Sequence, residues 1–236
     1  MNGIVNKSVR FVDLGVIDYQ EAWDYQTRLF DSTLAVKRKN REQPEQEPTA
    51  NYLIFCEHPH VYTLGKSGDE GNLLVSREKL PDIQATYYHI NRGGDITYHG
   101  PGQLVVYPVF DLENYFTDIH RYMRLLEEAV IVVLNRFQIT AGRLKGLTGV
   151  WLDPDDAVRA RKICAMGVKT SRWVTMHGLA LNVNTDLSYF GNIVPCGIQD
   201  KAVTSIANEL RQPQDMALVK DYMKSALSEI FEFEYN

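Results

Sequence analysis

The sequence predicts an α+β fold, in which helices cover a central sheet. Strand-like segments rich in aromatic and β-branched residues cluster in the middle of the chain, and helical segments lie towards its ends. The order of these segments does not follow a regular strand-helix-strand repeat, and we find no internal repeat. With 236 residues, 44% of them hydrophobic, the chain can bury one sizeable core. We therefore predict a single domain over residues 1–236.

The first predicted elements are a strand in "VRFVDLG" and a helix that follows it. Asp18 and Glu21 have the spacing of a helix-starting capping box, and apolar residues recur at helical intervals as far as Val36. The next stretch, residues 37–51, is basic and then acidic and contains two prolines. Runs of charge of this kind usually belong to solvated segments, so we predict a loop over 37–51.

The middle and the end of the chain supply the remaining elements. We predict strands joined by tight turns in "NYLIFCEHP", "VYTLG", "TYYHINRGG" and "DITYHGPGQLVVYPVF". Helical spacing of apolar residues from Asp118 to Phe137 predicts a second long helix lying on the sheet. Further strands follow in "LTGVWLD", "RKICAMGV" and "HGLALNV", and an apolar stripe from Val219 to Phe231 predicts a C-terminal helix.

Composition excludes several classes of protein. The net charge of -5 argues against a nucleic-acid-binding protein, which needs a basic face for phosphate contacts. No secretion signal and no apolar stretch long enough to cross a bilayer is present, so we expect a cytoplasmic protein without a membrane association. The scattered Cys56, Cys164 and Cys196 indicate reduced thiols, and their spacing does not predict a metal site.

The stretch "RGGDITYHGPGQLVVYP", residues 92–108, carries an unusual number of glycines before an apolar strand. Glycine pairs cost backbone entropy and so need a geometric reason. Two tight turns would be one reason. The alternative is a backbone that passes close to a bound ligand, with polar contacts from Arg92, Tyr98, His99 and Gln103.

Cys196 is the first candidate for covalent chemistry. It lies between proline and glycine in "IVPCGIQD", where a tight turn can present a thiol to a cavity, although a lone cysteine is more often a small buried side chain. Cys164 is a rival, but its regular-strand setting favours packing in the core. His99 and His177 are possible bases, and each is as often an ordinary hydrogen-bonded residue.

Lys162 is the candidate partner of such a thiol. In "ARKICAMGV" a strand period of two puts Lys162, Cys164 and Met166 on one face and the intervening residues on the other. A lysine at the start of a strand can simply reach solvent. The functional alternative is that its ammonium stabilises a nearby thiolate, so that the pair exchanges protons near neutral pH.

At this level of detail the chain resembles the lipoyl(octanoyl) transferases, which move an octanoyl group from acyl carrier protein to a lysine of lipoyl domains. The resemblance covers nearly the whole chain in order, through "HPHVYTLGKSG", "RGGDITYHGPGQLVVYPVFDL", "GLTGVWLD" and "RKICAMGVKTSRWVTMHGLALNVNTDLSYFGNIVPCGI". It implies the fold of biotin and lipoate protein ligases, with a mixed central sheet, a smaller sheet and surrounding helices. Two features depart from the family: Cys164 stands where alanine or serine is expected, and the 37–51 segment looks longer than usual.

The resemblance also implies residue roles and partners. A catalytic dyad falls on Cys196 and Lys162, and no cofactor or metal is required because a thioester is already activated. The donor is octanoyl-acyl carrier protein, the acceptors are lipoyl domains of 2-oxoacid dehydrogenase complexes and the glycine-cleavage carrier protein, and we expect a monomer. The implied substrate-binding residues are Arg92, Gly93, Gly94, Asp95, Ile96, Thr97, Tyr98, His99, Ala165, Met166, Gly167, Gly178, Leu179 and Ala180.

Two alternatives stay open at the level of sequence. An ATP-dependent lipoate or octanoate ligase shares the fold but has no use for a nucleophilic cysteine. A non-catalytic acyl-binding module of the same fold would need neither member of the dyad. Because acyl carrier proteins of this kind are acidic, we also expect a basic docking patch near the substrate channel, with Lys37, Arg38, Lys39, Arg41, Lys66 and Arg77 as candidates.

Overall fold

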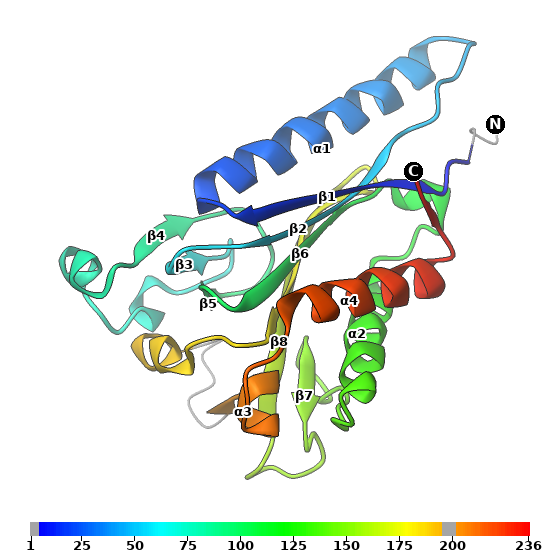
Figure 1. Cartoon of the computed structure of the whole chain (residues 1–236). Helices are drawn as coiled ribbons and strands as arrows, with labels where there is room; N and C mark the ends of the chain where they lie inside the picture. The colour runs from blue at the N-terminus through cyan, green and yellow to red at the C-terminus, as the bar shows by residue number, and fades with distance from the viewer. Residues whose placement is uncertain (1–4, 195–201) are drawn as a thin grey trace.

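The main sheet is mixed and has eight strands in the computed structural model of the protein, which describes residues 5–194 and 202–236 (Figure 1). Seven strands follow the order β10-β8-β9-β6-β2-β1-β11, and β7 pairs with β8 beside them. β1 is parallel to β2 and β11, β10 is parallel to β8, and the other pairings are antiparallel. The strands are β1 (Ser8–Val16), β2 (Asn51–Glu57), β6 (Gln103–Val109), β7 (Val150–Leu152), β8 (Arg161–Ser171), β9 (Val174–Asn182), β10 (Ala202–Val203) and β11 (Glu234–Tyr235).

A smaller sheet of three strands lies beside the main one, at the left of Figure 1. Its order is β4-β3-β5, with β3 (Val61–Leu64) in the centre, β4 (Thr86–His89) parallel to it and β5 (Ile96–His99) antiparallel. One face of this sheet packs on a cluster of apolar and aromatic side chains that includes Tyr62, Tyr98 and Ile193. The predicted combination of a mixed central sheet, a smaller sheet and helices is therefore confirmed.

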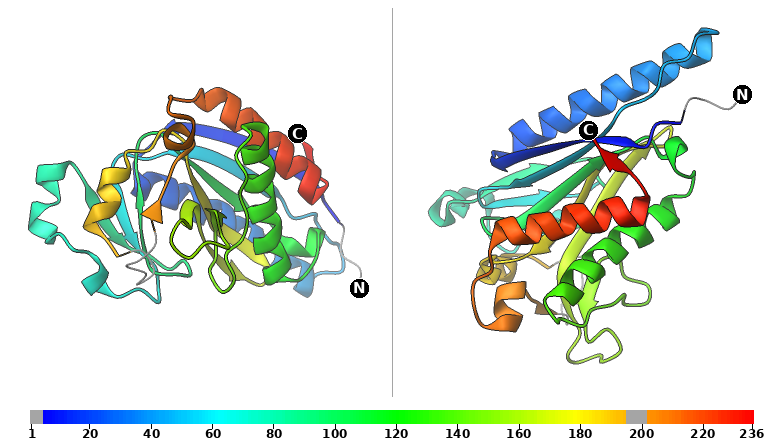
Figure 2. Two further views of the ribbon diagram at one scale, coloured as in Figure 1. Left: turned by 90° about the horizontal axis from the view of Figure 1, so that it is seen from below. Right: turned by 45° about the vertical axis from the view of Figure 1, so that its right-hand side comes forward.

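Helices cover both faces of the main sheet (Figure 2). α1 (Tyr19–Glu42) lies on one face, where Ala22 and Phe30 pack against Val105 and Ala180. α2 (Ile119–Arg136) and α4 (Met216–Phe231) lie together on the other face and enclose the larger apolar cluster. The short helix α3 (Ile206–Leu210) follows β10. The predicted start of the first helix is confirmed, since the Asp18 carboxylate accepts hydrogen bonds from the backbone of Gln20 and Glu21.

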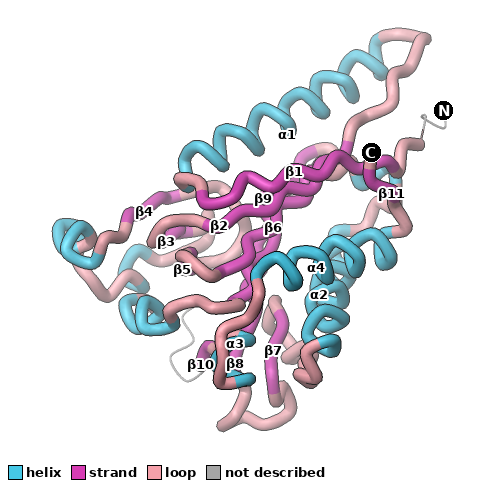
Figure 3. The backbone as a smooth tube through the Cα atoms, in the orientation of Figure 1, coloured by secondary structure: helices cyan, strands magenta, loops and turns pink. Residues whose placement is uncertain are grey.

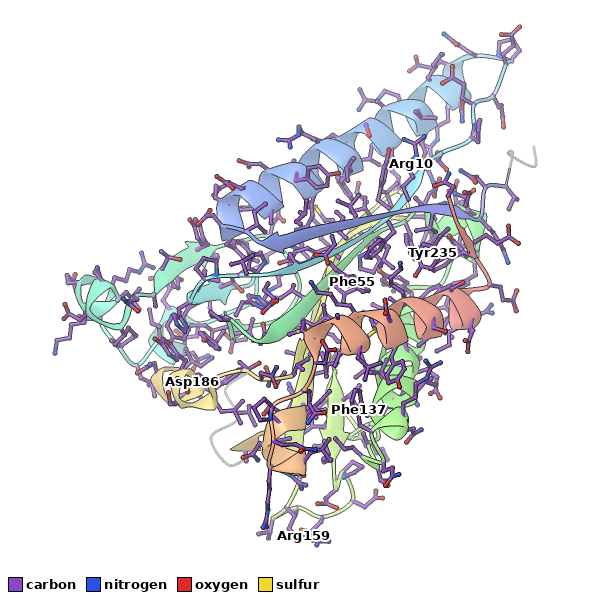
Figure 4. All side chains as sticks on the ribbon, in the orientation of Figure 1. Arg10, Phe55, Phe137, Arg159, Asp186 and Tyr235 are labelled. Carbon is purple, nitrogen blue, oxygen red and sulfur yellow. The ribbon has the colours of Figure 1, made fainter. Side chains whose placement is uncertain are left out.

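The core between sheet and helices is formed by long apolar side chains from the strands. Figure 4 shows Phe55 of β2 inside the molecule and Arg159 at its edge, in agreement with a fully buried phenylalanine and an exposed arginine. In Figure 3 the loops run around the periphery of the strands and helices. Within the described ranges, the helices are too short or too polar to cross a membrane.

The predicted loop over residues 37–51 is wrong in its first part, because α1 continues to Glu42. Lys37 is only 5% exposed, and its ammonium lies 2.5 Å from the carboxylate of Asp111 and 2.8 Å from that of Glu113. Thr49 also donates a hydrogen bond to Asp111, at 2.9 Å. The charge of Lys37 is therefore neutralised by carboxylates far along the chain, and this residue is buried where the charge pattern alone predicted solvent.

The strand prediction was also too short at the hairpin that follows "RKICAMGV". β8 continues to Ser171 and pairs with β9 from Val174 onwards. The two-residue turn is formed by Arg172 and Trp173, both at positive φ, 48° and 67°. Such turns usually contain glycine or asparagine, which explains why the sequence did not reveal this one.

Candidate active site

A pocket lies on the α1 side of the main sheet, between β8, β9, the start of α1 and the smaller sheet. The space between its walls, including the open mouth, is about 380 Å³. Five parts of the chain contribute its walls: the start of α1, β5 with the stretch that leads into it, and strands β6, β8 and β9. The lining residues are Tyr19, Arg92, Thr97, His99, Val105, Tyr107, Ala165, Met166, Gly167, His177, Gly178, Leu179 and Ala180.

Most of the implied substrate-binding residues therefore meet in one place. All of those on β8 and β9 line the pocket, because Ala165 pairs with Ala180, Met166 with Leu179 and Gly167 with Gly178 across the two strands. This pairing explains why residues 165–167 and 178–180, which are 11 to 15 positions apart in the sequence, form one wall. It does not by itself assign them a ligand.

The stretch from Arg92 to His99 divides between two faces of the smaller sheet. Thr97 and His99 face the pocket, whereas Ile96 and Tyr98 alternate with them on β5 and pack in the cluster behind the sheet. Asp95 holds local structure, since its carboxylate accepts hydrogen bonds from Asn72 at 2.6 Å and from the backbone of Ile96 at 2.7 Å. These three residues thus lie outside the pocket lining.

The glycines of the site allow backbones to approach one another closely. A Cβ at Gly167 would lie 2.7 Å from the carbonyl oxygen of Gly93, and one at Gly178 would lie 2.1 Å from that of Val106. Gly94 has a φ of +89° in the loop that leads to β5. Gly93 and Gly94 are not among the lining residues. Tight backbone geometry is therefore the reason that the structure gives for these glycines, and a close approach to a bound ligand stays a prediction.

Arg92 supplies the pocket with a permanent positive charge. It is 8% exposed, and its guanidinium donates to the backbone oxygen of Thr63 at 2.7 Å and to the Thr63 hydroxyl at 3.0 Å. Burial lowers the pKa of His99 to about 3 and that of His177 to about 3, and the charge of Arg92 acts in the same direction. Both histidines are therefore neutral at neutral pH and are weak bases.

His177 has two further unusual features. Its backbone is in the left-handed region, with a φ of 58°. Its Nε2 lies 3.3 Å from Oδ1 of Asn91, whereas its buried Nδ1 has no hydrogen-bond partner among the described residues. Among the described residues, the imidazole is therefore held through Nε2 alone.

Lys162 lies at the start of β8, next to the pocket-lining part of the strand but not in the lining itself. Its ammonium is 4.7 Å from the ring centre of the buried Trp151, with which it also pairs across β7 and β8. On its other side Lys162 pairs with Val203 of β10. Gly149 (φ +110°) packs over the carbonyl of Cys164, where a Cβ would lie 2.5 Å from the oxygen and 3.6 Å from Cε of Lys162.

The two candidate thiols differ in what the structure shows. Cys196 lies outside the described residues. Cys164 is fully buried in the cluster under α2 and α4, on the opposite side of the sheet from Ala165. Burial raises the pKa of the Cys164 thiol well above its ordinary value, and the nearby Lys162 offsets only part of this effect. Cys164 is thus an inert core thiol, as its strand setting predicted.

Sequence reasoning missed Tyr19 and Tyr107 in the pocket. Tyr19 begins α1 and stacks on His99, with ring centres 6.0 Å apart, and the Tyr107 hydroxyl is 2.8 Å from Nε2 of His58. Tyr19 follows the N-cap and therefore had to lie at the sheet end of α1, which was a usable signal. Tyr107 could have been found from the alternation along β6, which puts it on the same face as Val105.

The prediction that the segment around Lys37 forms part of a basic docking patch near the pocket is wrong. This residue is 18 positions beyond Tyr19 on a continuous helix, which places it about 27 Å from the pocket. Arg77 is paired with Glu70 at 2.9 Å. Lys66 remains close to the site, because its backbone nitrogen donates to the carbonyl oxygen of Arg92 at 3.0 Å.

Comparison with known proteins gives concordant matches. Residues 18–228 match the family described as the lipoyl protein ligase A/B catalytic domain. The chain is 64% identical to an octanoyltransferase of Cytophaga hutchinsonii, over 98% of this chain and 96% of that protein. It is 57% identical to an octanoyltransferase of Christiangramia forsetii, over 98% of both chains. The solved bi-partite lipoate protein ligase of Thermoplasma acidophilum has a TM-score of 0.66 at 17% identity, covering 98% of this chain and 86% of that one. At that identity the last likeness shows the fold alone, and it confirms the expected likeness to lipoate ligases.

Proposed function

This chain belongs to the lipoyl protein ligase A/B catalytic-domain family and acts as an octanoyltransferase in lipoate biosynthesis, and we propose that its donor is octanoyl-acyl carrier protein. The acceptor is a lysine of lipoyl domains, in 2-oxoacid dehydrogenase complexes and in the glycine-cleavage carrier protein. The observation that supports this most directly is the pocket on β8 and β9, which gathers Arg92, Thr97 and His99 with small and apolar residues of both strands. The small and apolar residues of β8 and β9 suit an uncharged acyl chain.

The proposed reaction has two steps. The Cys196 thiolate attacks the thioester carbonyl, so that a carbon–sulfur bond to the enzyme forms while the bond to the carrier's thiol breaks. The Lys162 ammonium gives its proton to the departing thiolate. In the second step the neutral amine of the acceptor lysine attacks the acyl-enzyme, a carbon–nitrogen bond forms, the Cys196 sulfur leaves, and Lys162 receives the proton that the amine loses.

Chain connectivity supports the pairing of Cys196 with Lys162. Val203, seven residues after Cys196, pairs with Lys162 in β10 and β8, and Thr204 donates a backbone hydrogen bond to the Lys162 carbonyl at 2.9 Å. Val194, two residues before Cys196, donates to the carbonyl of Asn72 beside the smaller sheet at 2.8 Å. The residue before the "PCG" sequence is thus bonded beside the smaller sheet, and the residues after it are bonded to Lys162 itself.

The test is the transfer of octanoyl from octanoyl-acyl carrier protein to an unmodified lipoyl domain without nucleotide or magnesium. The masses of the intact enzyme and of the lipoyl domain are measured by mass spectrometry. We expect the enzyme to gain one octanoyl group with the donor alone and to lose it when the lipoyl domain is added. An enzyme that is inert with this donor but active with free octanoate and ATP would establish the ligase alternative instead.

Two cysteine variants locate the acyl group. Cys196→Ala should form no acyl-enzyme and show no turnover. Cys164→Ala is the matched control: it should retain most of the activity, and peptide mapping should place the octanoyl group on the segment "IVPCGIQDK". An octanoyl group on Cys164 in the unmodified protein, or turnover that survives in Cys196→Ala, would contradict the mechanism.

A further inference from the structure

A line of buried polar side chains connects the pocket to the strand that pairs with Lys162. His99 Nδ1 lies 2.8 Å from Oε1 of Gln103. Nε2 of Gln103 donates to Oδ1 of Asn182 at 2.9 Å, and Nδ2 of Asn182 donates to the backbone oxygen of Thr204 at 3.0 Å. Thr204 in turn donates through its backbone nitrogen to the Lys162 carbonyl at 2.9 Å.

The direction of these hydrogen bonds is fixed by backbone carbonyls, which can only accept. Because the Thr204 oxygen accepts, Asn182 turns its NH₂ towards it and its own oxygen towards Gln103. The NH₂ of Gln103 also donates to the backbone oxygen of Tyr98, at 3.2 Å. The Gln103 oxygen is therefore the atom that faces His99, and this oxygen requires a proton on Nδ1 of the imidazole.

This polarity is protected from solvent. Gln103 is 1% exposed, Asn182 is 4% exposed and Thr204 is fully buried. If either amide were turned over, two donors or two acceptors would face one another without water to separate them. His99 is neutral, as described above, so a proton on Nδ1 leaves Nε2 with a free lone pair. The ring lines the pocket and Nδ1 is occupied by Gln103, so Nε2 is the nitrogen left for a bound group.

The strand register places His99 at the Lys162 end of the pocket. Gln103, the partner of His99, lies opposite Asn182, and the preceding Leu181 lies opposite Cys164 near the start of β8. His177 lies opposite Val168 and is five residues along β9 from Asn182, which is about 17 Å. The pocket thus presents the Nε2 acceptor of His99 at the end that is closer to the proposed chemistry.

We propose that Gln103 and Asn182 are positioning residues that hold His99 as the Nδ1–H tautomer, so that its Nε2 accepts a hydrogen bond from the amine of the acceptor lysine. This inference rests on the proposed function. The octanoyl chain and its thioester have no hydrogen-bond donor, so the N–H groups of the incoming amine are what this acceptor can bind in the second step. The bond orients the amine lone pair towards the thioester carbonyl, and no proton is transferred to His99.

The kinetic test separates the two half-reactions in single turnovers followed by intact mass. Asn182→Leu and Gln103→Met replace the amides with apolar side chains of similar size. We expect acyl-enzyme formation from octanoyl-acyl carrier protein within about twofold of the unmodified rate, and transfer to the lipoyl domain about tenfold slower, the effect of losing one hydrogen bond at the reacting amine. Asn114→Leu is the matched control, because Asn114 is a buried, hydrogen-bonded asparagine near the far end of α1, and both of its rates should stay unchanged.

A second measurement uses the unmodified enzyme and needs no substrate. Nitrogen-15 NMR of labelled histidine should show His99 protonated on Nδ1 and bare on Nε2 at neutral pH, and the two variants should show a mixture of tautomers. A proton on Nε2 in the unmodified enzyme, or variants that slow both half-reactions equally, would overturn the inference. Failure of the unmodified enzyme to form any acyl-enzyme would instead contradict the proposed function, and the tautomer measurement would still stand.

Discussion

Lys162 and Trp151 form the contact on which the proposed dyad depends most directly at the scale of single residues. The ring centre of Trp151 is 4.7 Å from the ammonium, and a partly desolvated contact of this type contributes about 0.5–2 kcal/mol. The face of the indole attracts the ammonium and holds it in place. The ammonium is the form that stabilises a thiolate and protonates the leaving thiol.

We predict that Trp151→Leu slows acyl-enzyme formation by about two- to thirtyfold, the rate equivalent of that energy. Trp151→Phe is the control, since it keeps an aromatic face and should retain most of the rate. Equal rates for the leucine and phenylalanine variants would show that the ring acts only by packing.

The contact between β8 and the loop before β5 is the feature that matters at the scale of elements. Gly167 of β8 faces the carbonyl of Gly93 so closely that a Cβ would lie 2.7 Å from it, and Cδ of Arg92 would be 3.2 Å away. Backbone atoms cannot move aside as a flexible side chain does. Any larger residue at Gly167 must therefore push the loop, and with it Arg92, away from the strand.

We predict that Gly167→Ala raises the KM for the octanoyl donor at least severalfold and destabilises the fold by about 1–3 kcal/mol, the usual cost of overpacking. Gly191→Ala is the control, because no atom lies within 4 Å of a Cβ at that position. Steady-state kinetics and urea unfolding of both variants make the comparison. A Gly167→Ala enzyme with unchanged KM would mean that the loop does not shape the substrate site.

The C-terminal part of α1 is anchored by a buried ion pair between Lys37 and Asp111, to which the half-exposed Glu113 adds a second carboxylate. Removal of one partner leaves the other charge buried without compensation. We predict that Lys37→Ala lowers the free energy of unfolding by about 3–5 kcal/mol. Lys39→Ala should change it little, since the ion pair of Lys39 with Glu47 is half exposed. Octanoyl transfer at low temperature should persist in both variants, because the anchor is remote from the pocket.

Most elements of the fold were predictable because each has a local signal. Asp18 marked the start of α1, and alternation along "RKICAMGV" predicted strand β8. The helical spacing of apolar residues predicted α2, which spans residues 119–136. The extension of α1 was not predictable, because Lys37 is neutralised by Asp111, 74 residues away. The sequence carried no measure of that contact.

The candidate site was only partly predictable for a related reason. The stretch from Arg92 to His99 was taken as one block, and only the alternation of β5 separates Thr97 from the neighbouring Ile96 and Tyr98. The hydrogen bond between Gln103 and Asn182 depends on the register of β6 against β9, and a single sequence does not contain that register. The role of Cys196 stays a prediction.

At the scale of the whole molecule, three buried histidines link folding to pH. Burial lowers the pKa of His58 to about 4 and those of His99 and His177 to about 3. In the unfolded chain each titrates near its ordinary value of about 6.5. Below about pH 6.5 these histidines therefore bind protons in the unfolded state but stay neutral in the folded state. The stabilisation is complete above about pH 6.5 and is lost progressively as the pH falls towards the folded-state values.

We predict that the free energy of unfolding falls by about 2 kcal/mol per histidine, roughly 6 kcal/mol in total, between neutral pH and about pH 5. Urea unfolding at a series of pH values measures this slope. Carboxylates contribute little in this window, because they are still ionised there. His120→Gln, which replaces an exposed histidine, should leave the slope unchanged. A free energy that stays flat down to about pH 5 would show that the three histidines are not buried in their neutral form.

The unpartnered Nδ1 of His177 has a consequence for the engineering of heat resistance. It is a buried polar atom without a hydrogen-bond partner among the described residues, and it belongs to a residue whose φ is 58°. Each of these features costs folding free energy, about 1–3 kcal/mol for a buried unpaired polar group and a similar amount for left-handed backbone at a residue with a side chain. His177 also lines the pocket. A variant selected for heat resistance at this position should therefore gain stability at the expense of the pocket.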